Sequence, residues 1–167
     1  MAGIVGIIAV GIFMVLWYRL PGLVASLALL VYIVAMLAIF QWVPVTLTAA
    51  GIAAFILSIG MAVDANVLIF ERMREELRAG KHTSDAIREG FSRAWLAIRD
   101  SNISSMITAI ILFWFCTSLI TGFALVFGLG ALVSMLTAIA VSRTFLFALG
   151  LPKSSFTRFL LGSGTRV

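Results

Sequence analysis

The sequence is poor in charged residues and in the side chains that build metal or redox sites. Only 11% of the 167 residues are charged, and the chain has one cysteine and one histidine. Because soluble domains are about 25% charged, this composition excludes an ordinary soluble enzyme, a disordered tail and a nucleic-acid-binding domain. The single Cys116 excludes an internal disulfide and a cysteine-based metal site, and the single His82 excludes a His-rich metal site.

Apolar side chains are abundant instead. They make up 62% of the chain, and the mean hydropathy is +1.16. A helix needs about 20 apolar residues to cross the hydrocarbon core, and five stretches come close to or exceed this length: residues 2–17, 23–40, 46–70, 103–120 and 123–142. The predicted fold is therefore an all-α integral membrane protein, with a transmembrane bundle over residues 1–142 and a basic cytoplasmic tail over 143–167.

The positive charges are confined to alternate connections. All 12 lysines and arginines follow the first, third or fifth predicted span, and the other connections have none. By the positive-inside rule, these segments lie in the cytoplasm and the N-terminus lies outside. The residues are Arg19; Arg72, Arg74, Arg78, Lys81, Arg88, Arg93 and Arg99; and Arg143, Lys153, Arg158 and Arg166.

The long connection over residues 71–100 has its own helical pattern. The third helix is expected to continue to Arg78 and to stop near Gly80, and Thr83 or Ser84 is a suitable cap for a further helix. Its apolar positions form one stripe beside basic residues, which predicts a separate cytoplasmic amphipathic helix between spans three and four. We expect its charges to form a solvated face, with partner docking as the alternative. The stripe consists of Ile87, Phe91, Ala94, Trp95 and Ile98.

Asp64 is the one acid among seven that falls inside a predicted span. A charged side chain at membrane depth costs about 2.5–3.5 kcal/mol, and such residues usually face the bundle interior or a water-filled path. One hypothesis is therefore a proton or ion relay, and the alternative is a carboxyl group that holds neighbouring helices together. The predicted spans contain no lysine or arginine. A cationic partner for Asp64 would thus come from another chain.

Other polar residues are predicted to lie at a similar depth. Asp64 is seven residues before Glu71, which is about 10 Å along a helix. Ser and Thr in membrane helices often bond only to their own backbone, so each one alone is weak evidence. The predicted supporting polar layer comprises Asn66, Asn102, Ser105, Thr108 and Thr137.

Two strips of small residues predict close helix packing. On the third span they recur every four residues, and Asp64 falls on another face because Asp64 and Asn66 differ by about 200° around the helix. We expect the strip to pack within the chain and the face with Asp64 to meet a partner. The packing residues are Ala54, Ser58 and Ala62 on the third span and Gly130, Ser134 and Ala138 on the fifth.

Residues 60–77 read GMAVDANVLIFERMREEL, and they resemble the signature of the SecD family of bacterial protein-export proteins. Met73 stands where the family commonly has isoleucine. Shorter segments that also resemble the family are 18–22, 100–105, 122–124, 128–130, 134–135 and 137–138, with Arg143 at the end of the last span.

The resemblance implies a function and a set of partners. SecD pairs with the homologous SecF, and the pair belongs to the resistance–nodulation–division (RND) superfamily. The resemblance further implies a bacterial inner-membrane protein that assists the SecYEG translocon and SecA, using the proton gradient for late steps of preprotein movement. Asp64 matches the family's proton-conducting aspartate, and a basic and an acidic residue of SecF would complete the path. The chain would then be helices two to six of a longer protein, surrounded by lipid, with no cofactor beyond the coupling proton.

Several alternatives stay open. Sodium is a second candidate for the coupling ion. The chain could be half of another RND transporter that moves a lipid or small molecule, or a non-catalytic membrane scaffold with Asp64 as a structural group. The sequence contains no Ser-His-Asp set, metal cluster or phosphate loop, and so it predicts no enzyme.

Overall fold

The computed structural model describes residues 2–43, 48–142 and 144, and every regular element in these ranges is helical. The predicted tail over 143–167 lies outside the described residues, apart from Thr144. Helices α2 to α5 have the length and apolar composition to cross a membrane, whereas α1 is a shorter apolar helix. The elements are α1 (Ala2–Tyr18), α2 (Leu20–Trp42), α3 (Ala49–Arg78), α4 (Thr83–Phe115), α5 (Ser118–Thr137) and a π-helical turn, Ala138–Ser142.

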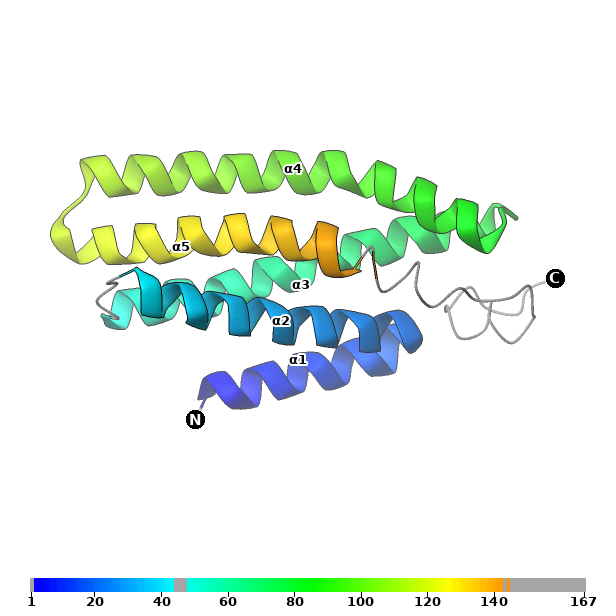
Figure 1. Cartoon of the computed structure of the whole chain (residues 1–167), viewed down its shortest axis with the longest axis horizontal. Coiled ribbons are helices and arrows are strands. Elements are labelled where there is room, and N and C mark those ends of the chain that lie inside the picture. Colours follow the sequence, from blue (N-terminus) through cyan, green and yellow to red (C-terminus); the bar gives the residue numbers. More distant parts are fainter. Residues whose placement is uncertain (1, 44–47, 143, 145–167) are drawn as a thin grey trace.

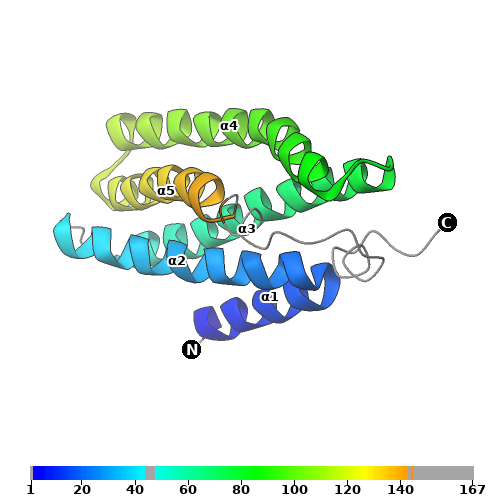
Figure 2. The same cartoon turned by 45° about the vertical axis from the view of Figure 1, so that its right-hand side comes forward.

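Helix α3 is the centre of the bundle. It packs against α4, α5 and α2, while α1 packs mainly on α2. Figures 1 and 2 show α4 at one edge of the molecule and α1 at the opposite edge. In Figure 1 the α3–α4 hairpin extends beyond the turn between α1 and α2. The all-helical bundle agrees with the predicted fold class.

The turn between α1 and α2 is very tight. Arg19 has a positive φ of 53°, and Pro21 stands in the first turn of α2, where a missing N–H is harmless. A Cβ on Gly22 would lie 2.0 Å from the carbonyl oxygen of Met14. Only glycine therefore allows the two helices to approach this closely.

The α3–α4 hairpin differs from the prediction in one respect. Helix α3 continues to Arg78, and Gly80 turns the chain with a φ of 86°, as expected. The predicted amphipathic helix is not separate, however, because α4 runs without interruption from Thr83 to Phe115. No glycine or proline occurs after Gly90 in this stretch, so nothing in the sequence breaks the helix.

The apolar stripe of the first half of α4 packs on the C-terminal end of α3. Ala94 and Ile98 are buried there. A Cβ on Gly90 would lie 2.6 Å from the Cα of Met73, so the two backbones are in contact. The charged residues on the other side of α4 are largely exposed, which matches the expected solvated face.

The connection between α4 and α5 lies earlier than predicted. The fourth span is predicted to reach residue 120, but α4 ends at Phe115. Cys116 and Thr117 are extended, and the carbonyl oxygen of Thr117 accepts bonds from the amides of Ile120 and Thr121. Residues 118–122 are thus the beginning of α5, which accommodates Gly122 within the helix.

Candidate functional site

Asp64 lies on the opposite side of α3 from the small-residue strip. Ala62, Ala65 and Asn66 are 2–5% exposed, whereas the Asp64 side chain is on the exposed surface of this chain. It therefore does not face the interior of the five-helix bundle. Among the residues that the structure describes, Asp64 has no hydrogen bond or ion pair. The carboxylate is open to a partner.

Two cavities meet at Asp64. The first, of about 180 Å³, lies between α3 and α4 and contains serine and asparagine side chains. The second, of about 400 Å³, lies between α1 and α3 and is otherwise apolar. We call them the α3–α4 pocket and the α1–α3 groove. The pocket is lined by Met61, Asp64, Ala65, Leu68, Ile98, Ser101, Asn102 and Ser105, and the groove by Gly6, Ile7, Val10, Ile56, Ile59, Gly60, Val63 and Asp64.

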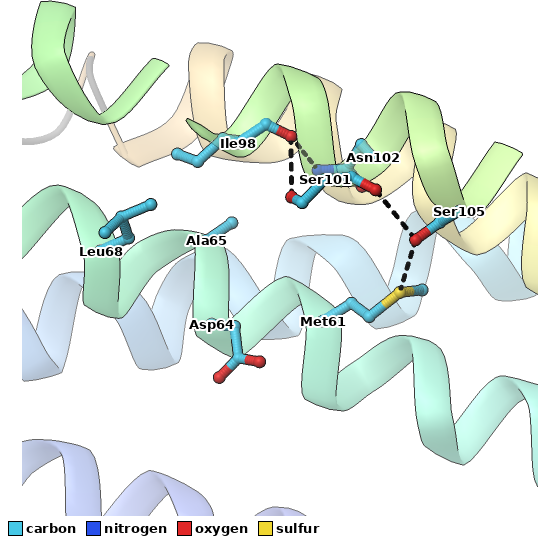
Figure 3. Close-up of a pocket in the computed structure, with 8 residues that line it drawn as sticks. All are labelled: Met61, Asp64, Ala65, Leu68, Ile98, Ser101, Asn102 and Ser105. Carbon is cyan, nitrogen blue, oxygen red and sulfur yellow. Dashed lines mark hydrogen bonds between the residues drawn. The ribbon is translucent and has the colours of Figure 1, made fainter. Parts of the chain in front are cut away.

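The polar groups of the α3–α4 pocket are held by their own helix. The Asn102 amide donates to the carbonyl oxygen of Ile98 over 2.8 Å, and the Ser101 hydroxyl donates to the same oxygen over 3.1 Å. The Ser105 hydroxyl bonds to the carbonyl oxygen of Ser101 (3.1 Å) and contacts the sulfur of Met61 (3.8 Å). Figure 3 shows the Asp64 carboxylate between the two ends of the pocket, directed away from α4.

The register of α3 and α4 brings charged residues to the level of Asp64. Gly90 lies against Met73 and Ser105 against Met61. Because the helices run antiparallel, Arg99 and Asp100 are nearly level with Asp64, although they form an exposed ion pair of 2.9 Å on the outer side of α4. The polar region at the end of the bundle with the α3–α4 turn therefore reaches further along α4 than along α3, where it begins at Glu71.

The predicted polar layer is only partly gathered at the site. Asn102 and Ser105 line the α3–α4 pocket with Asp64. Asn66 is buried with the strip, where its amide donates to Ala62. Thr108 and Thr137 line neither cavity, and their hydroxyls bond to carbonyl oxygens of their own helices. Thr108 is three residues beyond Ser105, almost one turn further out.

The small-residue strips lie where α2, α3 and α5 meet. Ala54, Ser58 and Ala62 are at most 2% exposed, as are Ser134 on α5 and Ala138 at the start of the π-helical turn. The Tyr32 hydroxyl donates to Ser58 over 2.6 Å, an interaction that the sequence reasoning missed. The one tyrosine of the predicted span 23–40 was the available signal, because a buried phenol needs a hydrogen-bond partner.

The sequence reasoning also missed a charged cluster beside the turn between α3 and α4. Glu76 is only 4% exposed, and it pairs with Lys81 over 2.6 Å and with Arg93. Lys81 also pairs with Glu89. Hydrogen bonds from Lys81 and then Arg93 hold the pKa of the Glu76 carboxyl below its usual value. Glu76 thus ties the end of α3 to the beginning of α4.

The chemistry available at the site is that of one carboxylate. Within the described ranges, no three His, Cys, Asp or Glu side chains gather to hold a metal ion. Asp64 is suited to take up and release a proton or a small cation, and the pocket hydroxyls and amide are suited to hold water beside it.

Comparisons with known proteins agree on a family. The model of the MMPL family matches residues 2–158. A protein translocase subunit SecD from Thermobaculum terrenum is 56% identical over 149 residues, covering 87% of this chain and 29% of that protein. The SecDF subunit of Bacillus subtilis is 50% identical over 148 residues, covering 89% of this chain and 20% of that protein.

A solved structure has the same fold. The crystal structure of SecDF from Thermus thermophilus, described as a translocon-associated membrane protein, superposes with a TM-score of 0.85 and 39% identity, covering 89% of this chain and 21% of that one. The chain thus spans about a third of the length of the curated SecD relatives that it matches, and about a fifth of the SecDF proteins.

Proposed function

This chain belongs to the MMPL family and matches the membrane region of SecD, and on this premise we propose that it is the ion-coupled membrane half of a Sec protein-translocation accessory subunit. In this function the chain performs no covalent chemistry. It converts the passage of a proton into movement of helices that act on the rest of the translocation machinery.

The observation that carries the proposal is the unpaired carboxylate of Asp64. It lies within an apolar helix, on the exposed face of α3, where two cavities meet. An ionisable group at this depth is costly, and it is usually retained for a proton or ion path. We propose that Asp64 accepts a proton from the periplasmic side and releases it toward the cytoplasm.

The second half of the path would come from SecF. Gly60 and Asp64 share the face of α3 that this chain leaves uncovered, and a Cβ at Gly60 would meet no atom within 4 Å. A helix of SecF has room to approach there and to place a cation against Asp64. Protonation of Asp64 would weaken that attraction and let the two halves shift. One charge crossing 100 mV supplies about 2.3 kcal/mol, which is sufficient for such a shift.

The charge pattern supports the orientation of the chain in a bacterial inner membrane. The α1–α2 turn and the α3–α4 hairpin both carry basic residues, and Figure 1 places them at the same end of the bundle. This end would lie in the cytoplasm, beside SecYEG and SecA, with the N-terminus on the periplasmic side.

The test is release of a preprotein from inverted membrane vesicles under an imposed proton gradient, with the full-length protein and its SecF partner. Asp64→Asn is expected to abolish the gradient-dependent step while the complex still assembles. Glu75→Gln, which removes an exposed carboxylate paired with Arg72 at the inner end of α3, is the control and should retain that step. If Asp64→Asn still responds to the gradient, Asp64 is structural and the scaffold alternative holds.

A further inference from the structure

Two apolar side chains, Val67 and Leu68, separate Asp64 from the charged residues at the C-terminal end of α3. Asp64, Leu68 and Arg72 are four residues apart, so they follow one another along the same face, about 6 Å from one to the next. Arg72 is already in the exposed charged region, where it pairs with Glu75 over 2.8 Å. Val67, three residues after Asp64, also lies on this side of the helix, but of the two Leu68 lines the α3–α4 pocket and Val67 does not.

Leu68 also closes one end of the α3–α4 pocket. Figure 3 shows Leu68 and Ile98 at the end nearer the hairpin, and Met61 and Ser105 at the opposite end, with Asp64 between them. Ile98 is 2% exposed, and Leu68 packs against the apolar cluster to which Ile98 belongs. The inner end of the pocket is thus apolar, whereas its middle carries Ser101 and Asn102.

The middle of the pocket is suited to water. A water molecule occupies about 30 Å³ in the liquid and needs two to four polar partners. The pocket has a volume of about 180 Å³, and it is lined by the hydroxyls of Ser101 and Ser105 on α4 and by Asp64 on α3. Because Arg99 and Asp100 reach the same level on α4, the inner aqueous region lies close to this pocket.

We propose that Leu68, together with Ile98 across the pocket, is the inner gate of the ion path, meaning the apolar barrier that separates water at Asp64 from the cytoplasmic surface. The inference rests on the proposed function of Asp64 and names the residues that control its inner access. While the Leu68 side chain fills the end of the pocket, a proton on Asp64 cannot leave inward. A displacement of Leu68 joins the pocket to the polar surface at Arg72.

The first test measures water access and does not depend on transport. The full-length protein carries Cys116→Ala and Ser105→Cys, and it is assembled with SecF in inverted vesicles. A membrane-impermeant thiol reagent is then added on the cytoplasmic side. Leu68→Ala is expected to raise the labelling rate of Ser105→Cys about tenfold, the factor for a barrier lowered by about 1.4 kcal/mol. Thr108→Cys, which lies outside the pocket, is the matched control and should not respond to Leu68→Ala. Equal labelling of Ser105→Cys with and without Leu68→Ala would overturn the gate.

The second test measures proton permeability of the same vesicles. Leu68→Ser is expected to produce a proton leak, and combining it with Asp64→Asn should abolish that leak. Leu57→Ser is the control, because Leu57 is 50% exposed on α3 and lines neither cavity. If the Leu68 variant speeds labelling in the first test but causes no proton leak in the second, Leu68 is still the gate, but Asp64 is not the proton relay. A leak that persists with Asp64→Asn would mean that Leu68 seals a path that bypasses Asp64, which would refute the gate as stated.

Discussion

Gly130 of α5 lies directly against Ser58 of α3, so closely that a Cβ on Gly130 would stand 2.4 Å from the Cβ of Ser58. The same added atom would be 3.0 Å from the Tyr32 hydroxyl. Three helices therefore converge on one point where no side chain fits. The Tyr32–Ser58 hydrogen bond is made at this point.

Gly130→Ala is expected to destabilise the bundle by about 1–3 kcal/mol, the usual cost of overpacking a core. Gly60→Ala on α3 is the control, because its Cβ would meet no atom within 4 Å. It should be neutral or stabilising by about 0.5–1 kcal/mol through helix propensity. Thermal unfolding of the purified protein in detergent measures both. A Gly130→Ala variant as stable as the parent would show that α3 and α5 pack less closely than described.

Glu76 should make the stability of the α3–α4 hairpin depend on acid. Because its pKa is lowered in the folded state by Lys81 and Arg93, its contribution is present above the unfolded pKa of about 4.3 and is lost as the pH falls through the folded value. The parent should therefore lose more stability on acidification below about pH 4.3 than Glu76→Gln, which lacks this titration. Thermal unfolding across pH 3–6 in detergent measures the difference, and identical pH profiles would refute the ion pairs.

Tyr18 is expected to fix the α1–α2 turn to α3. Its hydroxyl donates to Glu71 over 2.9 Å, and its ring packs near Phe70 and beneath the guanidinium of Arg74. Tyr18→Phe removes only the hydrogen bond, so it should cost about 1.5 kcal/mol. Tyr18→Ala also removes the ring and should cost more, about 3–5 kcal/mol. Thermal unfolding separates the two, and equal losses would mean that the ring contributes nothing.

The helical phase of α3 could be predicted from the sequence because it needs only the spacing of residues. Asp64 and Asn66 are two positions apart, so one of them had to leave the small-residue strip. The spacing could not predict which helix packs against each face of α3. The exposure of Asp64 follows from the way α1 packs on α2 and leaves a groove beside α3.

The ends of α4 could not be placed from the sequence for a different reason. Glycine, proline and charged residues are the usual sequence signals of a helix end, yet α4 passes through Arg99–Asp100 and ends at Phe115, where none of these signals is present. Packing on α3 stabilises the charged part of α4 as helix. The sequence analysis also missed Ser101 as a pocket residue, because Ser101 lines the pocket with Asp64 only when α4 continues as one helix through Arg99 and Asp100.

Asn102 and Asn66 form a matched pair that tests the polar pocket. Both amides are buried, and each donates to the carbonyl oxygen four residues earlier, over 2.8 Å for Asn102 and 2.9 Å for Asn66. Only Asn102 lines the pocket beside Asp64. Replacing either by leucine preserves the approximate volume, so the stability cost should be of the same order, about 1 kcal/mol.

The two variants should differ in coupling. Asn102→Leu makes the pocket less polar and should slow gradient-dependent preprotein release about tenfold, the effect of raising a barrier by about 1.4 kcal/mol. Asn66→Leu should leave that rate unchanged, because its amide lies on the other face of α3. Both are measured in vesicles with equal amounts of assembled complex. If both variants slow release equally, the effect comes from buried amides in general and not from the pocket. If Asn102→Leu does not slow release, the α3–α4 pocket is not part of the ion path.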